Sequence, residues 1–542
     1  MFENIKAFIV RLGVKMGFIQ DIKKIEQHRK IDLDSEIFER IAKNKAIYQG
    51  YYSKWHDVKY INSNGDEEKR NMLTLNVGKV SAQKMAKLIF NEKCDIDVSS
   101  IENEEGKSDI ADPAKEFVTQ TLNDNNFYRD FPKYLEYCYS LGGIALKVYY
   151  HEGLIKIAYA TADSFIPLSS DSENVDEALF ITREKKDKKF YTLLEWHEWE
   201  NDLYIITNEL YESGKDGELG HKVPLSMLYP DLEERTPIAN LKRPLFVYLK
   251  PNTANNKDLS SPIGVSIYEN AYDTLYMIDY LYDFYFHEFK LGKRRISVNR
   301  GMLKPVIDEN GNSKPVFDSD ETVFVPLGLD DDEPIKDLTV GLRVSDIVGA
   351  INHNLDVLAM QMGLSAGTFT FEGQGLKTAT QVISENSETY QTKNNHELLV
   401  ELAIKDLVVS ILSLASIEQY GLYDGTLDVD VVVNFDDSIA EDRQENYRYY
   451  ATAVKDGLYP KRKAIMKIFK VTKEEADNIL QEIQEESAEA MQQSLELQMD
   501  LMGVQSIAPI NQTKEDEGTG GIEEIEKKEE QKRKQRERQQ RQ

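Results

Sequence analysis

The sequence is poor in the residues from which most catalytic and metal sites are built. Its 542 residues include only two cysteines and eight histidines. Cys94 and Cys138 stand in helical, partly apolar contexts, which implies no disulfide framework and fits a reducing compartment. No histidine has the spacing of an HExxH motif or a zinc finger, and the sequence contains no Walker A motif. We therefore predict no catalytic residue, no metal site and no cofactor.

Basic residues are scarce as well. Lysine and arginine number 66 against 94 acids, which gives a formal net charge of −28. A protein that grips nucleic acid over most of its surface is usually basic. An acidic surface instead repels phosphate, which would let nucleic acid pass without sticking. The hydrophobic fraction of 41% is enough for two or more cores.

Neither of the most apolar stretches predicts a membrane span. Residues 1–32 predict an amphipathic N-terminal helix that basic residues interrupt and that no cleavage site follows. We expect it to dock on the body of the protein, with a peripheral membrane helix as the alternative. Two acids and a lysine interrupt the apolar stretch 398–415, which therefore predicts a buried helix.

The N-terminal half predicts helices followed by an antiparallel sheet. Residues 33–140 have mostly helical periodicity, with one helix over about 76–90 and another over 113–140. From Ile144 the period changes to two, and strands flank a turn at Glu152-Gly153. Further strands are expected at 178–184, 190–200, 202–213 and 245–251. The cluster Trp196-His197-Glu198-Trp199 lies within one of them, so alternation places the two tryptophans on opposite faces.

A helix over about 266–290 is apolar nearly all round, which indicates burial on most sides. It carries one polar stripe within an arc of about 120°. The stripe consists of Glu269, Asp273, Asp279, Asp283 and His287. It predicts either a solvated face of a core helix or, if copies of the helix pack together, a face toward a watery lumen.

Residues 291–344 predict a charged, β-rich excursion. Short strands are expected at 294–299, 321–327 and 335–340, with Asn310-Gly311 as a tight turn. Its basic cluster includes Lys293, Arg294, Arg295 and Arg300, and its acidic run is Asp330, Asp331, Asp332 and Glu333. Four consecutive acids cannot converge on one ion, so we favour a solvated loop over a metal site. Opposite charges this close would also suit contacts between identical subunits.

A second helix is expected over 345–364, followed by a glycine-rich loop over 365–377. Thr378 and Gln381 have the spacing of a capping box, which predicts that a long helix begins there and runs to about Tyr420. Its first half is polar and its second half apolar, and the sequence allows a break near Asn394-Asn395. A strand follows at 427–435, in which Asp428 and Asp430 are read as surface residues rather than metal ligands. Helices return over 438–504, and the charged tail 505–542 is expected to be disordered.

This order of elements resembles the portal proteins of tailed double-stranded-DNA bacteriophages, in particular those of phages that infect Gram-positive bacteria. Three phrases carry the likeness: GGIALKVYY at 142–150, DSFIPLSSD at 163–171, and SAGTFTFEGQGLKTATQVISENSETYQT at 365–392. The resemblance implies an α+β, mainly helical subunit in a cyclic ring, commonly of twelve copies. Its parts would be a wing (33–260), two stem helices (261–290 and 345–364), a clip (291–344), a tunnel loop (365–377), a long kinked helix with a returning wing strand (378–437), and a crown (438–504).

The resemblance also implies partners and a place. The ring would lie at the capsid vertex of the virion, after assembly in the host cytoplasm, and pass double-stranded DNA during packaging and ejection. Its partners would be the terminase large subunit, a head–tail adaptor, and the major capsid and scaffolding proteins, with no membrane. The stripe of the first stem helix would line the channel, and the clip charges would contact motor and connector. Thr368, Phe369, Thr370 and Phe371 would present a neutral surface to DNA, while Lys377 would contact phosphate without sequence preference.

Three other functions stay open from the sequence alone. The first is another phage head assembly or adaptor protein. The second is a metal-dependent phosphoesterase that uses the run Asp330–Glu333. The third is a peripheral membrane scaffold that uses the N-terminal helix.

Overall fold

The structure is a computed structural model, and it describes the following residues: 35–62, 65–100, 112–171, 174–259, 261–292, 296–298, 304–307, 313–316, 335–337, 341–370, 386–435, 443–469, 471, 473 and 475–487. The predicted N-terminal helix 1–32, the capping box at Thr378 and Gln381, and the tail 505–542 lie outside them. The chain forms two compact units, Met1–Thr472 and Lys473–Gln542. Among the described helices, none is both long and apolar enough to cross a membrane.

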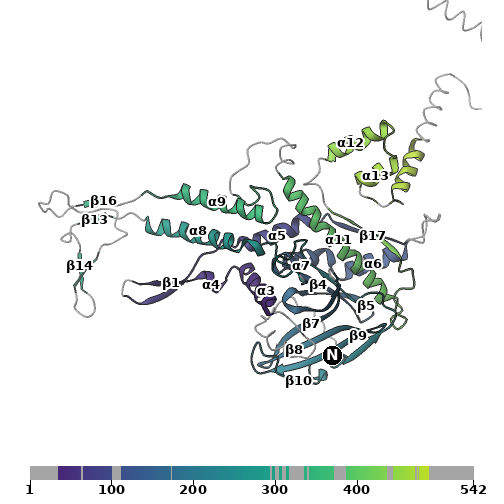
Figure 1. The fold of residues 1–542 in the computed structure, drawn as a ribbon, viewed down its shortest axis with the longest axis horizontal. Coiled ribbons are helices and arrows are strands. Elements are labelled where there is room, and N and C mark those ends of the chain that lie inside the picture. The colour runs from purple at the N-terminus through teal and green to yellow at the C-terminus, as the bar shows by residue number, and fades with distance from the viewer. Residues whose placement is uncertain are drawn as a thin grey trace, which may run out of the picture. The chain divides into compact units, whose positions relative to one another are not determined.

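The first unit is a mixed α+β structure (Figure 1). It begins with α3 (Ser35–Tyr48) and α4 (Ser53–His56), which lead into a hairpin of β1 (Asp57–Ile61) and β2 (Glu67–Asn71). Helix α5 (Val77–Ile89) confirms the helix predicted over 76–90, and β3 (Asp95–Ser100) follows it. The prediction that 33–140 is mostly helical is wrong at these three strands. The hairpin strands are charged and mostly exposed, so no alternation of apolar residues marks them.

The helix predicted over 113–140 is two helices, α6 (Pro113–Asp124) and α7 (Phe127–Leu141). The chain breaks between them because Asn126 takes a left-handed conformation, with φ of 50°. The Asn125 side chain fixes the break by donating to the carbonyl oxygens of Thr121 (2.8 Å) and Ile155 (2.9 Å). The Asn125 side chain therefore satisfies a carbonyl oxygen at the end of α6 and links it to Ile155.

The strands that follow confirm the predicted antiparallel sheet region. One sheet has the order β12-β4-β5, and its β4 and β5 flank the turn at Glu152-Gly153, where both residues have positive φ. A second sheet has the order β10-β9-β8-β7-β6, with β11 also paired to β9. The bounds are β4 (Ile144–His151), β5 (Leu154–Thr161), β6 (Phe165–Asp171), β7 (Asn174–Lys186), β8 (Lys189–Glu200), β9 (Leu203–Ser213), β10 (His221–Val223), β11 (Arg235–Ile238) and β12 (Phe246–Leu249).

Two helices of the central region correspond to the expected pair. A short 3₁₀ turn, η4 (Glu269–Ala271), leads into α8 (Tyr272–Leu291), and α9 (Val344–Gln361) follows the β-rich excursion. Within the excursion, β13 (Ile296–Val298) pairs with β16 (Ile335–Asp337), and β14 (Lys304–Ile307) pairs with β15 (Ser313–Val316). The strands near 294–299 and 335–340 are thereby confirmed, whereas the one at 321–327 and the turn at Asn310-Gly311 lie outside the described residues.

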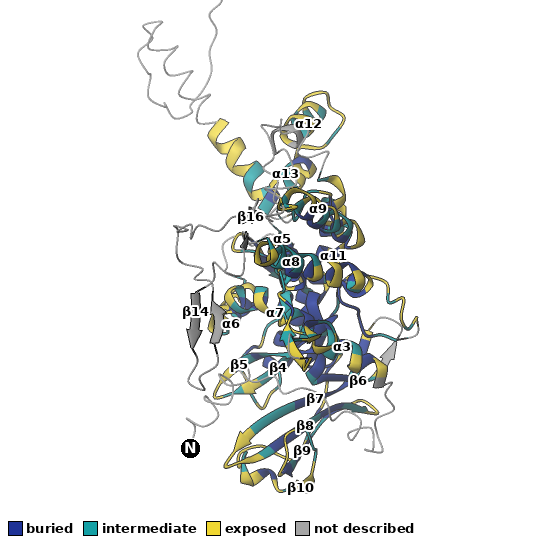
Figure 2. Cartoon of the chain, turned by 90° about the vertical axis from the view of Figure 1, so that its left-hand side faces the viewer, coloured by how far each residue is buried: buried dark blue, intermediate teal, exposed yellow. Residues whose placement is uncertain are grey.

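Helix α11 (Ser387–Ala415) is at the centre of the largest hydrophobic core, which also includes α5, α7, β4 and the returning strand β17 (Val429–Asn434). Helix α11 carries exposed, intermediate and buried residues (Figure 2), and its buried apolar residues belong to this core. The helix runs through Asn394 and Asn395 without the break that their polarity had suggested. Part of the polar first half is buried as well, because His396 is 4% exposed and Lys393 only 2%.

The C-terminal elements confirm the predicted helices. Helices α12 (Arg443–Lys455) and α13 (Lys461–Phe469) flank a turn in which Gly457 has a φ of 72°. In the second unit, residues 475–487 form a further helix.

Candidate functional site

Helices α8 and α9 lie side by side and run in opposite directions (Figure 1). Arg343, just before α9, donates to Glu288 near the end of α8 over 3.0 Å, and this bond lowers the pKa of Glu288. Beside it, Gly292 approaches Leu342 so closely that a Cβ at residue 292 would lie 2.1 Å from Leu342 Cδ2. At the opposite end, the last residues of α9 reach η4. The two helices thus form one antiparallel hairpin of helices.

The acids of α8 do not form the water-facing stripe predicted from the sequence. Glu269, Asp279 and Asp283 are 2%, 7% and 4% exposed, and all three accept hydrogen bonds from residues 40–75 of the same chain. The prediction is wrong for these three because helical periodicity finds a polar face but cannot tell water from a polar partner. Asp273 is exposed, and His287 is half-buried with its Nε2 3.8 Å from Asp283.

Asp283 binds Arg70 of β2 through two parallel hydrogen bonds of 2.8 and 2.7 Å, and it also accepts the Leu73 amide at 3.1 Å. Burial alone would raise the pKa of Asp283, but the bonds from Arg70 and Leu73 outweigh it and hold the pKa below its usual value. A planar guanidinium facing a carboxylate is a strong and directional contact. It fixes the β1–β2 hairpin to α8.

Asp279 lies one turn earlier on α8 and holds the chain just before α5. It accepts the Leu75 amide and the Thr74 hydroxyl, each at 2.9 Å, on one carboxylate oxygen. Its other oxygen lies 3.2 Å from Nε2 of the buried His56. The entry to α5 is therefore fixed to α8 by backbone and side chain together.

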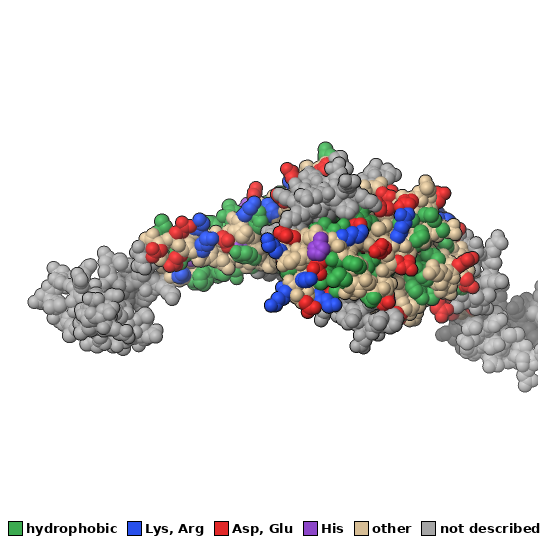
Figure 3. All heavy atoms as spheres, turned by 90° about the horizontal axis from the view of Figure 1, so that it is seen from below, with side chains coloured by type: hydrophobic (Ala, Val, Ile, Leu, Met, Phe, Trp, Pro, Cys, Tyr) green, Lys and Arg blue, Asp and Glu red, His purple; other side chains and the backbone are tan. Residues whose placement is uncertain are grey.

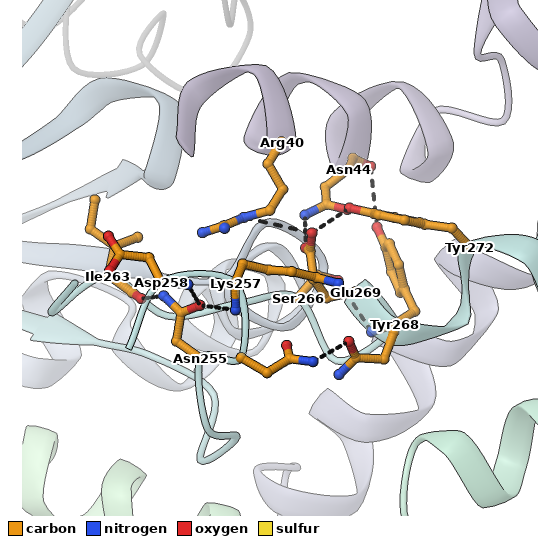
Figure 4. Close-up of polar contacts among 12 residues, drawn as sticks. Arg40, Asn44, Asn255, Lys257, Asp258, Ile263, Ser266, Tyr268, Glu269 and Tyr272 are labelled. Carbon is orange, nitrogen blue, oxygen red and sulfur yellow. Dashed lines mark hydrogen bonds and ion pairs between the residues drawn. The ribbon is translucent and has the colours of Figure 1, made fainter. Parts of the chain in front are cut away.

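Glu269 makes the third contact, to α3. Asn44 donates to it at 2.8 Å, Tyr272 donates at 2.8 Å, and Nε of Arg40 lies 3.6 Å away. Figure 4 shows these side chains converging on Glu269 from α3 and from the start of α8. Glu269 of η4 thus binds α3, while Asp279 and Asp283 of α8 bind the entry to α5 and the hairpin.

Helix α8 instead exposes large apolar side chains. The exposed ones range from 38% for Tyr276 to 58% for Leu291. They are Tyr276, Met277, Tyr280, Phe286, Phe289 and Leu291. At 100° per residue they spread over an arc of about 240°, on both sides of the buried acids, and we call this set the aromatic face. Exposed apolar surface of this extent commonly marks an interaction site.

The segment 363–370, which we call the loop root, is held by the two helices on either side of it. The Thr392 hydroxyl of α11 donates to the Gly363 carbonyl oxygen. The Ser365 amide donates to the Thr389 hydroxyl at 2.9 Å, and the Thr389 amide donates to the Ser365 hydroxyl at 3.2 Å. Asp356 of α9 accepts the Gly367 amide at 2.8 Å. The chain therefore leaves α9 in a fixed direction before the glycine-rich stretch begins.

Most predicted contact residues beyond the loop root lie outside the described residues. Thr368, Phe369 and Thr370 are half-buried, and Phe369 packs against the largest core. The residues not described are Phe371 and Lys377 of the loop and Lys293, Arg294, Arg295, Arg300, Asp330, Asp331 and Asp332 of the excursion.

One polar cluster has the residue types of a catalytic relay but lies inside the sheet region. Glu195 contacts Lys147 (2.6 Å) and His197 (2.7 Å), and His197 contacts the Tyr204 hydroxyl (2.7 Å). Burial lowers the pKa of His197, although Glu195 opposes the shift. His197 and Tyr204 are 1% and 0% exposed, so a substrate cannot reach them. The cluster joins β4 to β8, and among the described residues no group of His, Cys, Asp and Glu could hold a metal ion.

The sequence was compared with known protein families. A family model described as "Phage portal protein, SPP1 Gp6-like" matches residues 27–493. The chain belongs to this portal protein family. Portal proteins form the channel through which phage DNA is packaged and ejected, and they are structural proteins rather than enzymes. No curated protein matches the sequence significantly.

Family membership confirms the resemblance noted in the sequence, and it implies an oligomeric ring and phage head partners. Sequence reasoning located the stem-like helices and the loop but missed the inward contacts of the α8 acids. No local signal could have found these contacts, because nothing in the sequence around Arg70 points to Asp283.

Proposed function

We propose that portal subunits assemble into a ring of about twelve copies in which the aromatic face of α8 packs against the neighbouring subunit. The observation that carries this proposal is the inversion of polarity on α8, whose acids bind within the subunit while its aromatics face outward. Aromatic residues and methionine are enriched at protein interfaces. A ring requires each subunit to offer two different complementary surfaces, so this face would supply one of them.

We further propose that the loop 365–377 faces DNA in the channel, with Thr368, Phe369, Thr370 and Phe371 as a neutral surface and Lys377 at phosphate. The fixed direction of the loop root supports this, because three hydrogen-bonding residues aim the chain at its start. Figure 3 shows acidic and basic side chains interspersed on one face of the described surface, without one broad basic field. Such a surface suits passage of DNA better than a grip on it.

Residues 291–344 are proposed as the clip, with Lys293, Arg294, Arg295, Arg300, Asp330, Asp331 and Asp332 contacting the terminase large subunit and head–tail adaptor. Residues 33–260 with β17 are proposed as the wing, and 438–504 as the crown. Of the acids once assigned to the channel lining, Asp273 keeps that proposed role, together with His287. The ring would lie at the capsid vertex, in contact with the major capsid and scaffolding proteins.

The interface proposal is tested by a pair of methionine substitutions. Met277→Glu places a charge on the aromatic face, where Met277 is 44% exposed. Met227→Glu is the control and places a charge in the sheet region, shortly after β10, where Met227 is 50% exposed. Both residues are on the surface, so both variants should fold. Sedimentation velocity should show rings for Met227→Glu and the unmodified protein, but monomers for Met277→Glu. Rings of normal size from Met277→Glu would refute the interface.

The loop proposal is tested by deleting residues 369–375. Rings should form as before, because the deletion leaves α8 and α9 intact, and DNA packaging in a reconstituted system should fall. Normal packaging by rings of this variant would refute the role of the loop.

A further inference from the structure

The loop root has one more attachment, which comes from α5, far away in the sequence. Lys84 donates from Nζ to the Thr368 carbonyl oxygen at 2.9 Å. The same ammonium lies 5.7 Å from the centroid of the Phe369 ring, within the range of a cation–π contact. Among the described residues, Lys84 forms no ion pair with a carboxylate, so these two neighbours account for its contacts.

The position of Lys84 is set by a helix that cannot easily shift. Met85, Ala86 and Ile89 of α5 are at most 2% exposed and belong to the largest core. Lys84 itself is half-buried, and burial lowers its pKa. An ammonium in such a place needs its acceptor, because loss of the bond would leave a poorly hydrated charge.

Helix α5 also connects two contacts already described. Its entry, at Thr74 and Leu75, is bound by Asp279 of α8, and its third turn carries Lys84 to the loop root. The distance along the helix from Val77 to Lys84 is about 10 Å at 1.5 Å per residue. The helix therefore holds the Asp279 contact and the Lys84 contact at a fixed separation.

We propose that Lys84 is a positioning residue that fixes the root of the DNA-facing loop to α5 and, through α5, to α8. This inference rests on the proposed function of the loop. Beyond that function, the direction of the loop depends on a contact from α5, in the N-terminal part of the chain.

The test uses a spin label at residue 366, introduced as Ala366→Cys, because Ala366 is exposed next to Thr368. The native Cys94 and Cys138 are buried thiols, so a polar reagent should label only the new cysteine. Electron paramagnetic resonance then reports the fraction of mobile label in assembled rings. Lys84→Met should raise the ratio of mobile to immobile label about tenfold, as expected for loss of a hydrogen bond from a charged donor.

Two further variants separate positioning from other roles. Lys84→Arg keeps a charged donor and should restore an immobile label. Lys87→Met removes an exposed lysine on the same helix and should leave the spectrum unchanged. DNA packaging by the same rings should fall about tenfold for Lys84→Met and stay near normal for the other two variants.

Each other outcome overturns the inference. An unchanged spectrum for Lys84→Met would show that the contact does not hold the loop root. Lost packaging with an immobile label would show that Lys84 acts elsewhere, for instance on DNA phosphate. A mobile label with normal packaging would show that loop direction does not matter. If deletion of 369–375 also left packaging normal, the proposed function of the loop would fail, whereas impaired packaging by the deletion would confine the failure to Lys84.

Discussion

Replacing Asp283 by Asn should detach the β1–β2 hairpin from α8 without changing the shape of the side chain. The substitution removes the charge that Arg70 meets through bonds of 2.8 and 2.7 Å, while the amide oxygen of Asn can still accept from Leu73. A hydrogen bond to a charged group contributes about 1.5–3 kcal/mol, and breaking a fully buried ion pair costs about 3–5 kcal/mol. Because the Arg70 side chain is 32% exposed and can regain water, we expect the lower end, about 2 kcal/mol.

Hydrogen exchange followed by mass spectrometry measures this loss locally, which suits a chain too large for two-state unfolding. A change of about 2 kcal/mol corresponds to about a thirtyfold faster exchange. That acceleration should be confined to peptides covering residues 57–75. Asp273→Asn is the matched control, since Asp273 is on the same helix but exposed. Unchanged protection in Asp283→Asn, or an equal effect in Asp273→Asn, would refute the argument that Asp283 holds the hairpin.

Three further predictions follow from buried groups and close contacts. The pKa of Asp283 in the folded protein lies below its usual 3.8, so the stabilisation that its carboxylate provides is complete above about pH 4. This stabilisation is lost as the pH falls through the folded pKa. Protection of the hairpin from exchange should therefore drop at low pH in the unmodified protein but not in Asp283→Asn. Burial lowers the pKa of His396 from its usual 6.5 to about 4, so the free energy of unfolding should fall by about 3 kcal/mol between pH 6.5 and 4. Thermal unfolding of His396→Gln should depend less steeply on pH, and an equally steep profile would contradict this prediction. Gly142→Ala should destabilise the protein by several kcal/mol, because the φ of Gly142 is +96° and a Cβ would lie 2.8 Å from the Gly264 carbonyl oxygen. Gly153→Ala is the control, because Gly153 has a φ of +80° but open space around it, and it should cost only about 1 kcal/mol. Equal losses of stability in thermal unfolding would count against the close approach at Gly142.

The sequence predicts those elements whose residue pattern lies within the element itself, and it does not predict contacts between distant segments. Strands β4, β5, β7, β8 and β9 were predictable because one face alternates with the other along the strand. The pairing of β3 with β17 was not, since the partners are at opposite ends of the chain and nothing local specifies the register. The aromatic face of α8 could not be separated from its core face, because apolar residues surround the helix and only tertiary contacts decide which of them are covered.

The same limit explains the error at the polar stripe of α8. Periodicity placed Asp279 and Asp283 on one face correctly, and both do lie on one side of the helix toward the segment before α5. Whether such a face meets water or Arg70 depends on where a segment some 200 residues away folds back. The Lys84 contact with Thr368 has the same character, because a lysine on an amphipathic helix gives no sign of its acceptor.

Electron microscopy of the purified protein, with two-dimensional class averages, tests the central claim most directly. The account predicts rings of about twelve subunits around a central hole wide enough for duplex DNA, with α8 of each subunit at the contact with its neighbour. Compact monomers at high protein concentration, or closed particles without a channel, would contradict it.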